Sequence, residues 1–238
     1  DDFVRGLLAA FGPDRDQAIR RVRVYTFHAR IAERWQDGRV FLAGDAAHLT
    51  PPFAGQGMNS GLRDAHNLAW KLAEALRMDH PDELLASYET ERKPHAWSLI
   101  RLALRMGRVM MPASSLQGIG TRALFRLLAL YPAARDYVMQ MKYKPKPRFD
   151  AGFIWHDERP RKTSVVGRML PQPVVEAIDR STYLLDDVLG DRPILLILSK
   201  QPDIALPHDL QCKFETLGIA VLGLTPHSIN PVATTFPV

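Results

Sequence analysis

The sequence contains very little cysteine and has no long apolar run. Its one cysteine, Cys212, excludes an internal disulfide framework and a cysteine-based zinc site, and is typical of a reducing, cytoplasmic compartment. Apolar residues make up 46% of the 238 residues, enough for a core, yet no run approaches the length of a membrane span. The acidic start shows no secretory signal, and no HxxxH or HExxH pair suggests a metal site. We therefore expect a soluble protein without a disulfide, a metal centre or a membrane partner.

The net charge of +5 raises the question of nucleic-acid binding. The densest basic segments are residues 142–148 and 159–162, and prolines interrupt both. No known nucleic-acid module surrounds them, so solvated loops explain them better. A modestly basic surface also attracts small anionic ligands. We therefore expect a small-molecule partner and no nucleic acid.

The most informative segment is residues 39–76, which begins with a strand. Residues 40–43 form a short apolar run, and this run predicts a strand buried on both faces. Gly44 and Asp45 end the strand. They place a carboxylate at its carboxyl end, where open α/β sheets bind ligands.

The loop that follows is stiff at its start and permissive at its end. Pro51 and Pro52 fix φ and supply no N–H donor. Gly55 and Gly57 have no side chain, so the backbone there can approach a ligand closely just before a helix begins. This order of elements is typical of a nucleotide-cofactor site.

The helix is expected to begin at residues 57–59. Apolar residues at spacings of three and four predict one buried stripe along it: Met58, Leu62, Ala65, Ala69, Leu72 and Leu76. Polar residues are expected to lie off this stripe: Asn59, Arg63, Asp64, Asn67, Lys71 and Glu74. The helix N-terminus offers unpaired N–H groups and the positive end of a dipole, which suit an anion. The negative N1/O2 edge of a reduced flavin is a natural match.

The run GDAAHLTPPFAGQGMNSGLRDAHNLAWKL, at residues 44–72, resembles the second FAD motif of the flavoprotein aromatic hydroxylases, which are single-component monooxygenases. Residues 87–96, 142–150 and 165–173 are similar to the 3-(3-hydroxyphenyl)propionate hydroxylase branch, and the resemblance extends from about Val22 onward. It implies FAD as cofactor, NAD(P)H as electron donor, and O2 and a phenolic acid as substrates. The implied reaction is ortho-hydroxylation through a flavin C4a-hydroperoxide.

The resemblance also implies roles for single residues. Asp45 would bond the ribose of FAD, residues 51–57 would pass beside the isoalloxazine ring, and the backbone at Met58 and Asn59 would hold the pyrimidine edge. The expected cofactor-binding residues are Gly44, Asp45, Pro51, Pro52, Gly55, Gln56, Gly57, Met58 and Asn59. No side chain of the chain needs to act as a catalytic nucleophile or base.

Several residues near this motif keep more than one interpretation. Gln56 either contacts flavin or only spans the loop, and Arg63 and Asp64 either pair with each other or bond to the loop. His48 is not expected to act as a base, although a bond to the loop backbone is open to it. His66 and His95 have no partners that suggest a triad or a metal site.

The sequence also departs from the family pattern. It has no GxGxxG motif to hold the FAD pyrophosphate, and the Asp-Gly pair at residues 37–38 lies in the wrong context for the family's other FAD motif. We therefore expect an internal or C-terminal piece of a longer hydroxylase. Two alternatives stay open: a non-catalytic piece that needs its N-terminal half, or another flavoprotein oxidoreductase such as an epoxidase, halogenase or reductase. A homodimer is also open.

The expected fold class is α/β, with the C-terminal part of an FAD-binding Rossmann-like hydroxylase fold followed by a truncated thioredoxin-like domain. Four regions are expected: the end of the substrate domain (1–35), the C-terminal portion of the FAD-binding domain (36–111), a helical segment with a proline-rich connector (112–180) and the partial thioredoxin-like domain (181–238).

Local patterns predict the remaining elements. Alternation at residues 22–31 predicts a half-buried strand. Helices are expected at 3–11, 81–110 (with a kink or break at Pro94), 118–131 and 133–141. A parallel strand pair is expected at 194–198 and 219–224, around a helix at 207–217 on which Cys212 is buried.

Overall fold

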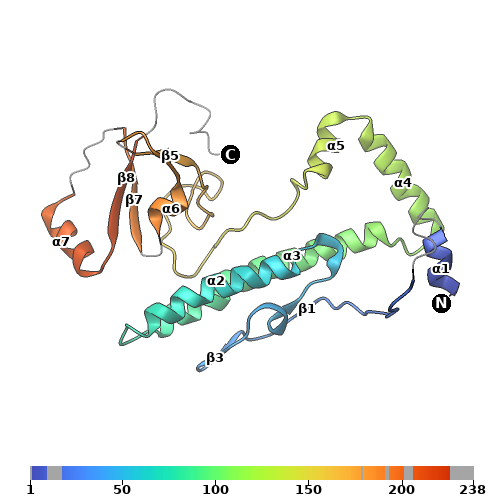
Figure 1. The fold of residues 1–238 in the computed structure, drawn as a ribbon, viewed down its shortest axis with the longest axis horizontal. Helices are drawn as coiled ribbons and strands as arrows, with labels where there is room; N and C mark the ends of the chain where they lie inside the picture. Colours follow the sequence, from blue (N-terminus) through green and yellow to red (C-terminus); the bar gives the residue numbers. More distant parts are fainter. Residues whose placement is uncertain (1, 10–17, 178, 191–192, 201–205, 226–238) are drawn as a thin grey trace. The chain divides into compact units, whose positions relative to one another are not determined.

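The computed structural model describes residues 2–9, 18–177, 179–190, 193–200 and 206–225. The chain divides into two compact units, residues 1–157 and 158–238, whose elements are drawn in Figure 1. The sequence placed the start of the last domain near residue 181. The second unit runs from residue 158 and includes a strand at 174–176 that pairs with a strand at 182–184. The identities given to the four expected regions stay predictions.

Two long helices dominate the first unit: α2 (Gly57–Ala75) and α3 (Asp82–Met110), which lie side by side in Figure 1. Both match the expected bounds. The predicted break at Pro94 is absent: α3 continues through this residue, where it lacks only the N–H donor that proline cannot supply. The shorter helices are also confirmed as α1 (Asp2–Leu8), α4 (Ser115–Ala129) and α5 (Pro132–Met139); residues 10–11 of the first predicted helix lie outside the described residues.

The strands of the first unit are short and antiparallel. β1 (Arg30–Ile31) pairs with β4 (His48–Leu49), and β2 (Gln36–Asp37) pairs with β3 (Val40–Phe41). The strand predicted at 22–31 is therefore wrong except at its last two residues. The strand predicted at 40–43 is shorter, at Val40–Phe41, and forms a hairpin with β2. It is not buried on both faces, since Val40 is 66% exposed. Two 3₁₀ turns follow, η2 (Gly44–Ala46) and η3 (Pro52–Ala54).

A small apolar core joins these strands to the helices. It contains Trp35, Ala47, Leu68, Tyr88 and Ala96, with Ile31, Ala32, Phe41 and Leu42 packed against it. The Tyr88 hydroxyl donates to the carbonyl oxygen of Leu42 at 2.9 Å, so the aromatic core also satisfies a backbone acceptor of the hairpin. This core fixes the segment that precedes the predicted cofactor loop.

The predicted buried stripe of α2 is wrong. All six of its apolar residues are exposed, from Leu72 at 38% to Leu76 at 91% among those with large side chains. The buried residues of α2 are instead Ser60, Asp64, Asn67, Leu68 and Lys71. The reason is the neighbouring helix: α3 presents the buried charges of Glu91 and Arg92, and these charges need polar partners.

The second unit begins with an antiparallel pair, β5 (Val174–Glu176) and β6 (Thr182–Leu184), followed by α6 (Leu185–Leu189). β7 (Ile194–Leu198) and β8 (Ala220–Leu224) are parallel, and α7 (His208–Thr216) lies between them in sequence. The parallel pair and its helix are therefore confirmed. Cys212 is exposed, so its predicted burial is wrong; no residue of α7 is buried within the described part of the chain.

Two remaining findings concern the connector and membrane spans. Residues 143–173 contain neither a helix nor a strand of two or more residues, as the prolines predict. Among the described residues, no helix combines the length and the apolar character needed to cross a bilayer.

Candidate functional site

The predicted cofactor segment folds as two 3₁₀ turns that lead into α2. Gly44 has a φ of +57°, which favours glycine, and a Cβ built on Gly61 of α2 would come within 3.2 Å of the Gly44 Cα. The start of the segment therefore lies directly against the helix. Residues 44–59 form one continuous structure around the N-terminus of α2.

The predicted site residues differ in exposure. Asp45 is exposed on η2, while Pro51 is buried and Pro52 is exposed at the start of η3. The Gln56 side chain donates to the carbonyl oxygens of Ala54 and Gly55, at 3.1 and 3.2 Å. Gln56 therefore bonds within the loop, and its contact with flavin stays a prediction.

The end of the loop is open. Gly55 has a φ of +58°, and a Cβ built on Gly55 or on Gly57 meets no atom within 4 Å among the described residues. Met58 and Asn59 are exposed in the first turn of α2. No side chain of the described residues caps this helix, so its first N–H groups face outward without an intrahelical acceptor.

A buried carboxylate lies immediately behind this open surface. Asp64 is fully buried and accepts three hydrogen bonds: from the backbone N–H of Gly44 at 3.1 Å, from His48 Nε2 at 2.7 Å and from Arg92 Nε at 2.9 Å. Burial acts to raise the pKa of Asp64, but the bond from His48 and the charge of Arg92 together hold that pKa below its ordinary value. Among the described residues, Asp64 therefore follows neither interpretation: it bonds the backbone of Gly44, which precedes the loop at residues 51–57, and Arg63 bonds His95 instead.

His48 and His95 lie on either side of this carboxylate network. His48 is buried, and its ring lies 5.4 Å from that of Trp35 between centroids. It bonds the Asp64 side chain and not the loop backbone. His95 lies 3.3 Å from Arg63 Nη1, and burial, followed by the charges of Arg92 and Arg63, lowers the pKa of His95 to about 4. His95 is thus neutral at pH 7 and accepts the bond from Arg63.

A second buried network lies further along α2. Lys71 is fully buried and donates to Glu91 at 2.7 Å and to the Ser87 hydroxyl. Glu91 also accepts from Asn67 Nδ2 and from the backbone N–H of Phe153, each at 2.7 Å. Burial lowers the pKa of Lys71, although the bond to Glu91 opposes this effect.

Sequence reasoning missed most of this polar interior. It placed Asp64 and Lys71 off the predicted buried stripe and gave Asp64 a bond to Arg63 or to the loop, but it did not name Trp35, Glu91 or Arg92 as structural partners. A signal was present: Ser60, Asp64, Asn67 and Lys71 recur at spacings of three and four, which defines a second, polar face of the same helix.

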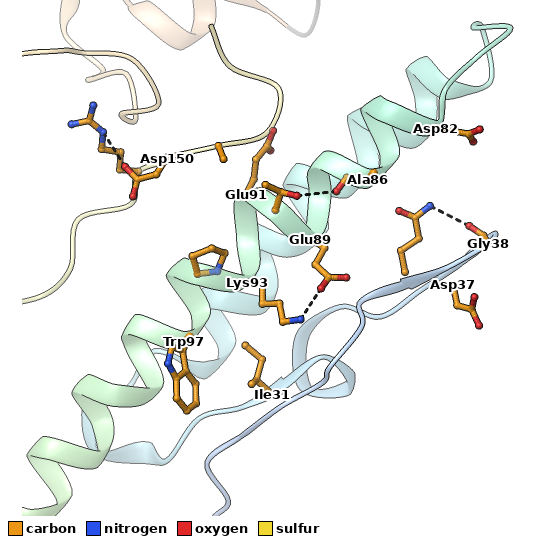
Figure 2. Close-up of a pocket in the computed structure, with 15 residues that line it drawn as sticks. Ile31, Asp37, Gly38, Asp82, Ala86, Glu89, Glu91, Lys93, Trp97 and Asp150 are labelled. Atoms are coloured by element: carbon orange, nitrogen blue, oxygen red, sulfur yellow. Dashed lines mark hydrogen bonds and ion pairs between the residues drawn. The ribbon is translucent and has the colours of Figure 1, made fainter. Parts of the chain in front are cut away.

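A separate open cavity of about 1020 Å³ lies between α3, the β2–β3 hairpin and residues 148–151. Figure 2 shows Trp97 and Ile31 at one end and Asp37 and Asp82 at the other, with the Lys93–Glu89 ion pair of 2.6 Å between them. Carboxylates outnumber cations in its lining, which does not favour an anionic substrate. None of the predicted cofactor-binding residues lines it. Within the described residues, no group of His, Cys, Asp and Glu could hold a metal ion.

Two family models match the chain. Residues 1–103 match the FAD binding domain, and residues 167–235 match the HcaD C-terminal domain. The first match contains the whole loop and α2, together with all the residues of the Asp64 network.

Two similar curated proteins are described as 3-(3-hydroxy-phenyl)propionate/3-hydroxycinnamic acid hydroxylase. The protein from Mycolicibacterium smegmatis is 40% identical over 227 residues, which cover 94% of this chain and 40% of the relative. The protein from Burkholderia cenocepacia is 42% identical over 219 residues, which cover 91% of this chain and 40% of the relative. The chain thus spans about 40% of the length of these relatives.

Three solved structures are also similar. OxyS anhydrotetracycline hydroxylase from Streptomyces rimosus matches with a TM-score of 0.60 and 28% identity, over 82% of this chain and 37% of that protein. BexE matches with a TM-score of 0.63 and 28% identity, over 87% of this chain and 40% of that protein. The flavin-dependent monooxygenase PieE, solved with FAD and substrate, shares the fold at 22% identity and a TM-score of 0.62, over 85% of this chain and 41% of that protein.

Proposed function

We propose that the chain is part of an FAD-dependent hydroxylase, an NAD(P)H-using monooxygenase that hydroxylates a phenolic acid. The substrate we propose is of the 3-(3-hydroxyphenyl)propionate type, hydroxylated ortho to its hydroxyl group. The observation that carries this proposal is the open, uncapped N-terminus of α2 beside a glycine-rich loop.

The residues of the loop fit a flavin. Where a Cβ would stand on Gly55 and Gly57 there is open space, so a planar ring can approach the backbone. The N–H groups of Gly57, Met58 and Asn59 precede the first intrahelical bond, which Ser60 N makes to Gln56 O at 2.9 Å. These groups would hold the pyrimidine edge. When FAD is bound, it supplies the redox chemistry and the activation of O2.

The protein's own contribution is electrostatic and positional. The positive end of the α2 dipole favours negative charge at the first turn, by about 0.3–1 kcal/mol for an exposed group. The exposed carboxylate of Asp45 is free to accept from ribose hydroxyl groups. Pro51 and Pro52 restrict the loop backbone between these two contacts. No side chain of this segment is required as a nucleophile or base.

An FAD titration of the purified chain tests cofactor binding. Flavin fluorescence and the visible spectrum are followed for the chain, for Asp45→Ala and for Asp37→Ala. Asp37 is the matched control, because it is an exposed carboxylate on β2 outside the predicted cofactor segment. Binding that weakens roughly tenfold in Asp45→Ala, as loss of a charged hydrogen bond predicts, and stays unchanged in Asp37→Ala supports the assignment. Equal affinities in all three proteins contradict it.

A chimera tests the reaction. The segment of the Mycolicibacterium smegmatis relative that this chain matches is replaced by the chain, and NADH or NADPH consumption is measured with 3-(3-hydroxyphenyl)propionate. We expect a dihydroxylated product in the mass spectrum, and we expect NADH or NADPH consumption to be coupled to its formation. A folded, yellow chimera that consumes NAD(P)H without forming this product contradicts the proposed substrate and reaction.

A further inference from the structure

The buried carboxylate of Asp64 connects the three elements that surround the predicted flavin loop. Its Oδ2 atom accepts from Gly44 N and from His48 Nε2, which lie before the loop. Its Oδ1 atom accepts from Arg92 of α3. Asp64 itself lies on α2, after the loop. One side chain therefore ties both ends of residues 49–59 to the long helix behind them.

Arg92 extends this connection to the first turn of α2. Its Nε atom donates to Asp64, and its Nη2 atom donates to the carbonyl oxygen of Ser60 at 3.4 Å. Both Arg92 and Asp64 are at least 98% buried, so solvent does not compete for these bonds. The Ser60 carbonyl is one residue from the N–H groups that face outward. Arg92 thus acts on the position of the helix terminus itself.

The backbone leaves little room for another arrangement. Gly44 and Gly61 are in close contact, and Gly44 has a backbone conformation that other residues rarely adopt. This close packing brings the Gly44 N–H within reach of Asp64. Gly44 and Gly61 therefore allow the loop start to approach α2, and the Asp64 carboxylate holds it there through the Gly44 N–H.

We propose that Asp64 is a positioning residue for the flavin loop, and that Arg92 and His48 complete this function. Asp64 contacts neither the open surface nor the exposed first turn of α2, so it acts through Gly44, His48 and Arg92, and Arg92 in turn bonds the Ser60 carbonyl. It holds the start of the loop and the helix terminus at a fixed separation. The role toward flavin rests on the proposed function, whereas the role in ordering residues 44–60 does not.

The ordering role is tested without any cofactor. Amide hydrogen exchange of the purified chain is measured for the chain, for Asp64→Asn and for Asp79→Asn, the last being an exposed acid in the connection between α2 and α3. We expect exchange of residues 44–60 to become roughly tenfold faster in Asp64→Asn, with the Gly44 amide most affected, because its charged acceptor is lost. The Asp79→Asn control should leave the segment unchanged.

Global stability is measured in parallel, because removal of a buried charge also weakens the fold. Urea unfolding gives the change in the global free energy of unfolding, and the exchange of the α3 amides shows whether it increases to the same degree as that of residues 44–60. A local increase confined to residues 44–60 supports the proposal. Unchanged exchange in this segment, or an equal increase throughout the unit, overturns it.

The role toward flavin has its own readout. FAD affinity and the visible circular dichroism of bound flavin are compared for the chain, Asp64→Asn and Arg92→Lys. We expect about tenfold weaker binding and an altered flavin spectrum in Asp64→Asn. Arg92→Lys should show a smaller change, because it keeps the charge and loses the second bond to Ser60. Absence of FAD binding both in the wild-type chain and in its chimera with the Mycolicibacterium smegmatis relative contradicts the proposed function, whereas FAD binding with an unchanged spectrum in folded Asp64→Asn contradicts the positioning role alone.

Discussion

Replacement of Lys71 by methionine should destabilise the first unit strongly. Lys71 is fully buried, and its ammonium group lies 2.7 Å from Glu91. Lys71→Met keeps most of the side-chain volume but leaves Glu91 as a buried charge, with only Asn67 and the backbone N–H of Phe153 as donors. Loss of one partner of a buried ion pair costs about 3–5 kcal/mol in the free energy of unfolding.

The double variant Lys71→Met/Glu91→Gln should recover much of this loss. It contains no unpaired buried charge, and its new amide can still accept from Phe153 N. Asn67 Oδ1 has no hydrogen-bond partner among the described residues, so a flipped Asn67 amide can accept from the glutamine Nε2. We expect the double variant to be less destabilised than Lys71→Met alone, with a coupling free energy of about 2 kcal/mol or more.

Tryptophan fluorescence during urea unfolding is a suitable assay. All four tryptophans of the chain, Trp35, Trp70, Trp97 and Trp155, lie in the first unit, so their emission reports on that unit. Arg77→Met is the control, since the Arg77–Glu74 pair is exposed and should contribute about 0–1 kcal/mol. If Lys71→Met costs no more than Arg77→Met, the Lys71–Glu91 pair is not the buried pair that the structure shows.

Two further predictions concern His95 and the glycines. The pKa of His95 is about 4 in the folded protein against an ordinary 6.5, so the unfolded chain binds this proton first and stability is lost as the pH falls from 6.5 to 4. His95→Gln should lower the slope of the unfolding free energy against pH in this range by up to about 1.4 kcal/mol per pH unit. An unchanged slope contradicts a neutral, buried His95. A Cβ on Gly107 of α3 would come within 2.7 Å of the Phe53 ring, whereas one on Gly120 of α4 meets nothing within 4 Å. Gly107→Ala should therefore cost about 1–3 kcal/mol by overpacking, and Gly120→Ala should stabilise its helix by up to about 1 kcal/mol. Thermal unfolding followed by circular dichroism compares the two, and equal midpoints would contradict the close contact with Phe53.

Local patterns predicted the helices and the parallel strand pair well, because their signals lie within short segments. The apolar run at 194–198 is a strand with those same bounds, and the helix expected at 81–110 is α3 at Asp82–Met110. Such elements depend on periodicity, end signals and propensity, all of which a single sequence contains. The prediction of the strands in the first unit failed because strands depend on partners that lie elsewhere in the sequence. A strand at 22–31 needs a partner strand, and the described residues pair only Arg30 and Ile31.

The candidate site was only partly predictable. The glycines and the helix terminus at residues 55–59 follow from the sequence, because glycine and proline act locally. The buried side of α2 does not, since it depends on Glu91 and Arg92 more than twenty residues away. Apolar periodicity assigned Met58 and Leu62 to the interior, yet both are exposed. Periodicity identifies the faces of a helix, but the neighbouring element, here α3, decides which of them is buried.

The two buried ion pairs also constrain how α2 lies along α3. Apolar residues of similar volume can often replace a buried pair without loss of stability, so stability alone does not account for four buried charges. Each carboxylate here has particular donors: Asp64 bonds to Arg92, and Glu91 bonds to Lys71 and Asn67. A slide of α2 by one turn along α3 would separate these partners and leave charges buried without them, which an apolar interface would tolerate far better. The polar interface therefore selects one register between the helices, and that register places the open N-terminus of α2 at a fixed point beside the loop.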